Sequence, residues 1–99
     1  MKRFETTIND FKVSVNPHEV HNPYCDIVNH TTYIDGVKTV CSFHRYINEN
    51  KKGFEIYKYK DGEIGYYWSR LYSYDNYPSK YEDVFNKLEN AHNEIFGKW

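Results

Sequence analysis

The stretch richest in side chains suited to recognition runs from residue 57 to residue 72. Tyrosine, tryptophan and arginine recur there, and these types are enriched at binding hot spots because they bury a large area with few rotatable bonds. Their alternation predicts that they share one face of a β-hairpin around Asp61-Gly62, where they would bind a partner by burial, stacking and hydrogen bonding. The residues of this predicted binding face are Tyr57, Tyr59, Tyr66, Trp68, Arg70 and Tyr72.

A second interpretation makes this aromatic face the buried side of the sheet. The opposite face of the same hairpin would then meet water. That face also holds charged residues near the turn, where they could overhang a core: Lys58, Lys60 and Glu63. We favour the binding interpretation, in which the core residues of this hairpin are Phe54, Ile56, Tyr67 and Leu71.

Histidine and cysteine offer metal-ligating atoms in two segments, His18-x2-His21-x3-Cys25 and Cys41-x2-His44. A structural zinc site needs four ligands. Residues three apart on a strand point to opposite faces, so Cys41 and His44 are not expected to chelate one ion together. We expect no metal and no cofactor. In the register given below the two cysteines face other residues and lie too far apart for a disulfide, so we expect free thiols.

Groups for acid and base catalysis are also present. His44, Arg45, Glu55 and Arg70 could form the site of a small ribonuclease, in which a base and an acid flank the phosphate. No GxSxG, P-loop, GxGxxG or HExxH motif accompanies them. We interpret the chain as non-enzymatic.

Composition narrows the class of protein. The 99 residues predict a single domain spanning 1–99, and the formal charge of −1 is spread without a block of one sign. A duplex-DNA binder is usually basic and a DNA mimic acidic, so neither class is favoured. No signal peptide and no run of about 20 apolar residues is found, which predicts a cytoplasmic protein with no membrane partner.

Three hairpins are expected in the first 72 residues, before a C-terminal helix. Asn9-Asp10 predicts a turn between two strands within residues 3–16, and Asp35-Gly36 predicts another within residues 26–46. Residues 47–53 are expected to be a polar connection, and residues 54–72 form the aromatic hairpin. In the second hairpin the pairs on the expected core side are Ile34 with Val37, Thr32 with Thr39, His30 with Cys41, Val28 with Phe43, and Asp26 with Arg45.

The segment from Ser79 to Phe96 has the spacing of an amphipathic helix. Ser79 and Glu82 match a capping box at its start, and Gly97 is suited to end it. The apolar stripe consists of Tyr81, Val84, Phe85, Leu88, Ala91, Ile95 and Phe96. The predicted fold is α+β, an antiparallel sheet of about five to six strands in sequential hairpins with this C-terminal helix packed on one face.

The function predicted from these features is a small protein-binding module that acts through its aromatic sheet face. The composition, with abundant Asn, Lys and Tyr and one alanine, is typical of an AT-rich genome. Together with the small size and near-neutral charge, it resembles the general style of small phage or mobile-element proteins that inhibit a host defence nuclease, such as anti-CRISPR or anti-restriction factors. The expected partner is then a host protein, for example a nuclease complex, and closure of the face by a homodimer is a further expectation. The first alternative is a module that stacks single-stranded nucleic acid on its tyrosines, and the second is a small ribonuclease.

Overall fold

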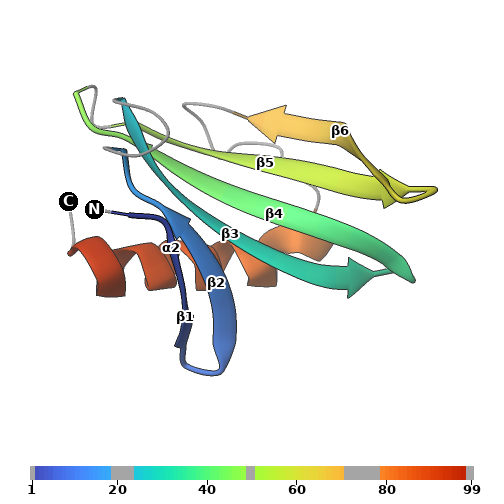
Figure 1. Cartoon of the computed structure of the whole chain (residues 1–99), viewed down its shortest axis with the longest axis horizontal. Helices are drawn as coiled ribbons and strands as arrows, with labels where there is room; N and C mark the ends of the chain where they lie inside the picture. The colour runs from blue at the N-terminus through green and yellow to red at the C-terminus, as the bar shows by residue number, and fades with distance from the viewer. Residues whose placement is uncertain (1, 19–23, 49–50, 71–78, 98–99) are drawn as a thin grey trace.

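In the part of the chain that the structure describes, six antiparallel strands form one sheet and a single long helix crosses one of its faces (Figure 1). The computed structural model describes residues 2–18, 24–48, 51–70 and 79–97, with the backbone alone at positions 66 and 68–70. Each strand pairs with the next in sequence order, which confirms the predicted α+β fold of sequential hairpins. The elements are β1 (Phe4–Ile8), β2 (Phe11–Asn16), β3 (Cys25–Ile34), β4 (Val37–Tyr46), β5 (Lys51–Lys60), β6 (Glu63–Arg70), a 3₁₀ turn η1 (Ser79–Tyr81) and α2 (Glu82–Phe96).

The three predicted two-residue turns are confirmed by their backbone angles. Asn9 and Asp10 have φ of 51° and 63°, Asp35 and Gly36 have 54° and 77°, and Asp61 and Gly62 have 53° and 83°. Two consecutive positive φ values define the turn whose twist matches that of antiparallel strands. The turn chemistry therefore sets the register within each hairpin.

The register of β3 with β4 is the predicted one at every position. Val28 lies opposite Phe43, and His30 lies opposite Cys41. The residues of this hairpin that are buried on the helix side are Asp26, Val28, Thr39, Cys41 and Phe43. The two cysteines are free, as expected, because Cys25 faces Tyr46 in the same register.

The helix covers the apolar face of the sheet over β2, β3 and β4. Phe85 stacks on Phe54 with ring centroids 3.9 Å apart, and Phe43 lies beside Phe54 at 5.3 Å. Leu88 and Ala91 are fully buried below the strands. Burial at about 25 cal/mol per Å² of apolar surface makes this layer the main source of stability.

The start of the helix differs from the prediction. The chain enters through η1, and Tyr81 occupies the N-cap position with no side-chain hydrogen bond, so the expected capping box of Ser79 and Glu82 does not form. Tyr81 is instead buried at 1% exposure, and packing of its ring takes the place of a polar cap. At the other end Gly97 has a positive φ of 87°, but its ψ of 162° is not that of the left-handed helical conformation expected to close the helix. Its N–H donates to the Asn93 carbonyl at 2.8 Å.

The third hairpin also departs from the prediction. β5 begins at Lys51 rather than after Gly53, because Lys51 and Lys52 pair with Tyr46 and Arg45. A β-bulge interrupts the pairing of β5 with β6, so Tyr57 lies opposite Tyr66 while Ile56 lies opposite Trp68. The expected core residues Phe54 and Ile56 are buried.

Tyr67 was expected in that core and is 50% exposed. It is the extra residue of the bulge, and the Lys58 Nζ lies 3.8 Å from its ring centroid. Leu71, the fourth expected core residue, lies outside the described residues.

His92 is a buried residue that the helical pattern did not identify. It is 0% exposed between the rings of Phe43 and Phe96, at centroid distances of 5.1 and 4.9 Å. Neither ring nitrogen has a hydrogen-bond partner within the described part of the chain. Burial, aided by the positive charge of Arg45, lowers the pKa of His92 from 6.5 to about 4.

This pKa predicts that acid destabilises the fold through His92. Between pH 6.5 and about 4 the unfolded chain binds a proton that the folded chain excludes, so the free energy of unfolding should fall by up to about 3 kcal/mol as the pH drops through that window. A His92→Leu variant should lack this part of the pH dependence. Urea unfolding of both proteins from pH 7 to pH 4 measures it, and parallel curves would contradict the assignment.

Candidate functional site

The face of the sheet that lies away from α2, called here the outer face, carries a row of polar residues across the first five strands. The register connects each member to the next on the neighbouring strand. The row consists of Glu5, Ser14, Asn29, Ser42 and Glu55. Polar residues at this depth of a sheet require partners, and the central members find them in one another.

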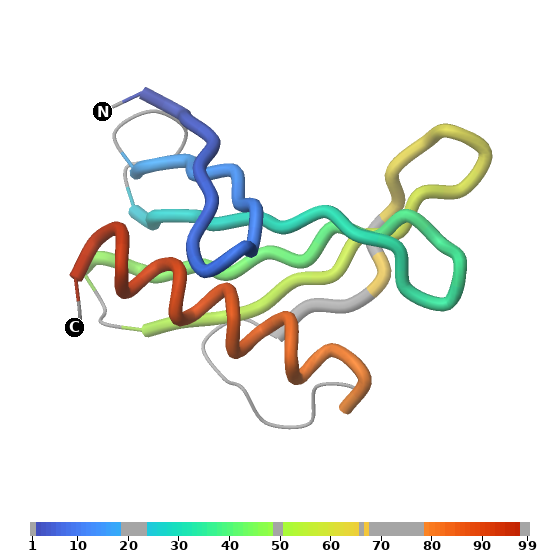
Figure 2. Tube along the Cα trace, turned by 90° about the horizontal axis from the view of Figure 1, so that it is seen from below, coloured from blue at the N-terminus to red at the C-terminus, as the bar shows by residue number. Residues whose placement is uncertain are grey.

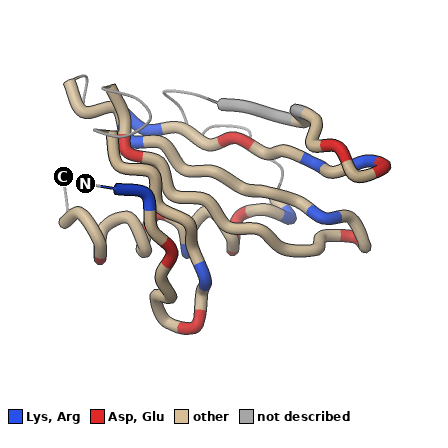
Figure 3. The backbone as a smooth tube through the Cα atoms, viewed as in Figure 1, with Lys and Arg blue, Asp and Glu red and all other residues tan. Residues whose placement is uncertain are grey.

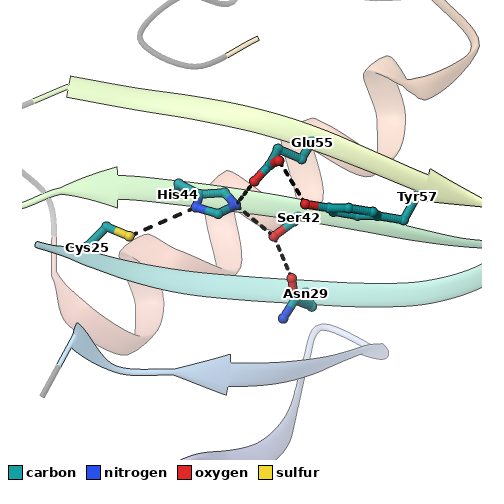
Figure 4. Close-up of polar contacts among 6 residues, drawn as sticks. All are labelled: Cys25, Asn29, Ser42, His44, Glu55 and Tyr57. Atoms are coloured by element: carbon teal, nitrogen blue, oxygen red, sulfur yellow. Dashed lines mark hydrogen bonds and ion pairs between the residues drawn. The ribbon is translucent and has the colours of Figure 1, made fainter. Parts of the chain in front are cut away.

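A hydrogen-bonded network joins the centre of this row, and Figure 4 shows its six members. The Ser42 hydroxyl donates to Asn29 Oδ1 at 2.5 Å and lies 3.1 Å from His44 Nε2. His44 Nε2 is 2.8 Å from Glu55 Oε1, and the Tyr57 hydroxyl donates to Glu55 Oε2 at 2.8 Å. We call Cys25, Asn29, Ser42, His44, Glu55 and Tyr57 the outer network.

The electrostatics of the network favour an ionised Glu55. The hydrogen bond from His44 lowers the pKa of this carboxyl most, the bond from Tyr57 lowers it further, and burial opposes both. Because the folded-state pKa is lowered, the bonds stabilise the fold at neutral pH, and that stabilisation is lost when acid protonates Glu55.

His44 contacts Cys25 through one ring nitrogen and Glu55 through the other, as the base of a catalytic triad contacts its nucleophile and its acid. Cys25 Sγ lies 4.0 Å from His44 Nδ1. Burial raises the pKa of the Cys25 thiol to about 11, and the residue is 1% exposed. The thiolate is the nucleophilic form of cysteine, so a thiol that stays protonated acts only as a weak donor to Nδ1. The arrangement therefore supports a structural role.

The ribonuclease hypothesis named four residues, and the structure brings two of them together. His44 and Glu55 are in contact, with side chains only 12% and 15% exposed. Both nitrogens of His44 already face protein atoms, whereas a general base needs one open to substrate. Arg45 lies in register with Asp26, on the helix side, and the side chain of Arg70 is outside what the structure describes.

Aromatic and apolar residues adjoin the outer network toward the tips of the two long hairpins, and we call them the outer patch. Tyr33 is 71% exposed and Ile64 is 52% exposed. The ammonium group of Lys38 lies 4.5 Å from the ring centroid of Tyr59, and the ring of Tyr57 is held by its bond to Glu55. The outer patch consists of Tyr33, Lys38, Val40, Tyr57, Tyr59 and Ile64.

The position of this patch follows from the length of the hairpins. In Figure 2 the tips at residues 35–36 and 61–62 extend beyond the start of the helix. Lys80 in η1 donates to Asp35 at the first of these tips, at 2.6 Å, and this bond lowers the pKa of Asp35. An exposed ion pair therefore joins this tip to the segment that leads into the helix.

The six predicted binding residues occupy different places. Tyr57 and Tyr59 belong to the outer patch, and the backbone of Tyr66 lies opposite Tyr57. The bulge puts Trp68 and Arg70 in register with the helix-facing residues Ile56 and Phe54. The single face expected for all six assumed an unbroken register.

The side chains of Tyr66, Trp68 and Arg70 are outside what the structure describes, as is Tyr72 altogether. Their part in binding stays a prediction. Tyr33 and Ile64 were missed as binding candidates, although the alternation of the predicted hairpins, which put Ile64 on the same face as Tyr57 and Tyr59, was the signal that could have found Ile64.

No group of three or more metal-ligating side chains occurs among the described residues. Of the histidine and cysteine segments, Cys41 lies on the helix side and His44 on the outer face, as expected, while His21 is outside the described residues. Lysine, arginine, aspartate and glutamate are mixed over the described chain (Figure 3). Within that part of the chain, no helix has both the length and the apolar character needed to cross a membrane.

Comparisons with protein-family models, with curated proteins and with solved structures found no match to this chain.

The outer network predicts a measurable coupling between His44 and Glu55. We expect the double-mutant cycle of His44→Ala and Glu55→Ala to give a coupling free energy of about 1–3 kcal/mol at pH 7, because each single variant leaves the other polar group buried without its partner. Urea unfolding of the four proteins measures it. As a control, the exposed pair of Lys12 and Glu5, 3.7 Å apart, should show coupling of at most about 0.5 kcal/mol. Equal values for the two cycles would contradict the network.

Proposed function

We propose that this protein is a non-enzymatic protein-binding module that binds its partner through the outer patch. The observation that carries the proposal is the exposure of Tyr33 and Ile64, at 71% and 52%, at the two ends of a row on one sheet face in which Lys38 and Tyr59 lie between them. A surface row that keeps large apolar side chains exposed is a common mark of an interaction site.

The outer network supports this role by fixing the orientation of Tyr57, which belongs to both the network and the patch. Tyr57 bonds to Glu55, which bonds to His44, so the ring is oriented before any partner arrives. A side chain that is already ordered loses little conformational entropy on binding, and the affinity gains accordingly. Strands also hold side chains more rigidly than loops do.

The partner proposed is a folded protein. Tyrosines with one lysine form a surface that can bury apolar area while the hydroxyl and ammonium groups hydrogen-bond at the rim. Inhibition of a host defence nuclease, the class that the style of the sequence resembles, is the specific form of this proposal.

Single-stranded nucleic acid is the second candidate, because two lysines lie over tyrosine rings. Lys38 lies over Tyr59, and Lys58 lies over Tyr67. Of these groups, Lys38 and Tyr59 belong to the outer patch, whereas Lys58 lies in register with Thr39 of the helix side. Bases stacked on the tyrosines with their phosphates near lysine would bind in a way that weakens steeply as salt rises.

A tagged-protein capture experiment separates these proposals. The wild type and a Tyr33→Ser, Tyr59→Ser double variant are used to capture partners from a low-GC bacterial lysate, with and without nuclease, at low and high salt. We expect a defined protein that survives both treatments and whose affinity, once it is purified, falls at least about tenfold with the double variant.

Tyr24→Ser is the matched control. Tyr24 is 63% exposed but lies at the opposite end of β3, so its loss should leave binding unchanged. Both variants should unfold at urea concentrations close to the wild type, since exposed substitutions rarely change stability by more than about 0.5 kcal/mol. Recovery of nucleic acid alone, lost at high salt, would overturn the protein-binding proposal in favour of the second candidate.

A further inference from the structure

The first strand has an outer edge that no other strand of the described chain pairs with. Ile8 and Phe11 flank the two-residue turn and therefore exchange both of their backbone hydrogen bonds. By alternation Phe4 and Thr6 also bond toward β2. The N–H and C=O groups of Glu5 and Thr7 point away from the sheet, ready to pair with another strand.

This edge differs from the one at the other end of the sheet. β6 carries the bulge in its pairing with β5, and bulges twist an edge and disfavour added strands. β1 pairs with β2 in one unbroken register from Phe4 to Ile8. Of the two end strands, β1 is the regular one.

We propose that a second copy of this chain pairs with β1 antiparallel, about a two-fold axis that passes through Thr6. Glu5 then lies opposite the partner's Thr7, and by symmetry Thr7 lies opposite the partner's Glu5, which gives four backbone hydrogen bonds and extends the sheet to twelve strands. Thr6 lies opposite the partner's Thr6. Phe4 lies opposite the partner's Ile8, and such aromatic with β-branched and Thr with Thr pairs stabilise antiparallel strands.

The neighbouring registers are less favourable. An axis through Glu5 would place two carboxylates opposite each other. An axis through Thr7 would require Asn9, whose φ is 51°, to join the ladder. An axis through Phe4 would pair Arg3, which precedes the strand, and would leave the groups of Thr7 unpaired.

A cleft beside this edge supplies a second reason for the register. It has a volume of about 220 Å³ between the tip of the first hairpin and the middle of α2, with apolar walls from Ile8 and Phe11. The other lining residues are Asn9, Asn86, Lys87 and Asn90. In the proposed register the partner's Phe4 lies next to Ile8, at the mouth of this cleft.

Burial agrees with the same pairing. Phe4 and Ile8 are only partly buried in one copy, so association covers apolar surface on both sides of the axis. The dimer uses none of the outer patch and is independent of the proposed function.

Cysteine cross-linking tests the register directly. Thr6 and the partner's Thr6 form a non-hydrogen-bonded pair with Cα atoms about 4.5 Å apart, within the range of a disulfide, so Thr6→Cys should give a covalent dimer under mild oxidation. Thr7→Cys is the matched control, because Thr7 and the partner's Thr7 are offset by two residues along the strands. The native cysteines are at most 1% exposed and should add little background.

Light scattering over a concentration series completes the test. The wild type should shift from monomer to dimer, and Thr7→Pro, which removes an outward N–H without touching the bonds to β2, should raise the dissociation constant about tenfold or more. Tyr59→Ser should leave dimerisation unchanged. A wild type that stays monomeric, or equal cross-linking of Thr6→Cys and Thr7→Cys, would overturn the proposal. If Thr7→Pro fails to fold, the cysteine pair still decides.

Discussion

The packing of α2 on one face of the sheet is the constraint on which the rest of the structure depends. Phe43, Phe54 and Phe85 form its aromatic centre, and Leu88 and Ala91 lie fully buried beside them. Among the described residues, one helix covers one face of the six-stranded sheet. Within that part of the chain, the other face is stabilised by its own side chains, which is the role of the hydrogen-bonded network there.

The outer network and the outer patch are neighbouring parts of that second face, with different properties. The network buries Ser42 at 3% exposure and leaves little of His44 or Glu55 accessible. The patch, one or two residues further along the same strands, leaves Tyr33 mostly exposed. Groups that would suggest catalysis are thus occupied in holding the sheet, and groups that suit recognition face outward, which is why we favour binding over chemistry.

Local signals in the sequence were enough to predict the hairpins, because two-residue turns such as Asp35-Gly36 fix both the loop and the register of their strands. The partnership of His44 with Glu55 was not predictable, since β4 and β5 are joined by a longer connection with no turn signal to fix the register between them. The bulge at Tyr67 was missed for a related reason: one extra residue in β6 shifts the register of Trp68 and Arg70 against β5, and the alternation of residue types in the sequence does not show this shift. His92 was not predicted to be a core residue because the sequence alone does not distinguish a buried neutral histidine from an exposed one.

The most direct test of the account is a map of backbone amide shifts by nuclear magnetic resonance when the captured partner is added to labelled protein. The account predicts that the largest changes fall on the outer patch, at Tyr33, Lys38, Tyr59 and Ile64, with small changes along the exposed side of α2. Changes concentrated on α2, for example at Asp83 and Asn90, would contradict the claim that the outer face is the binding surface.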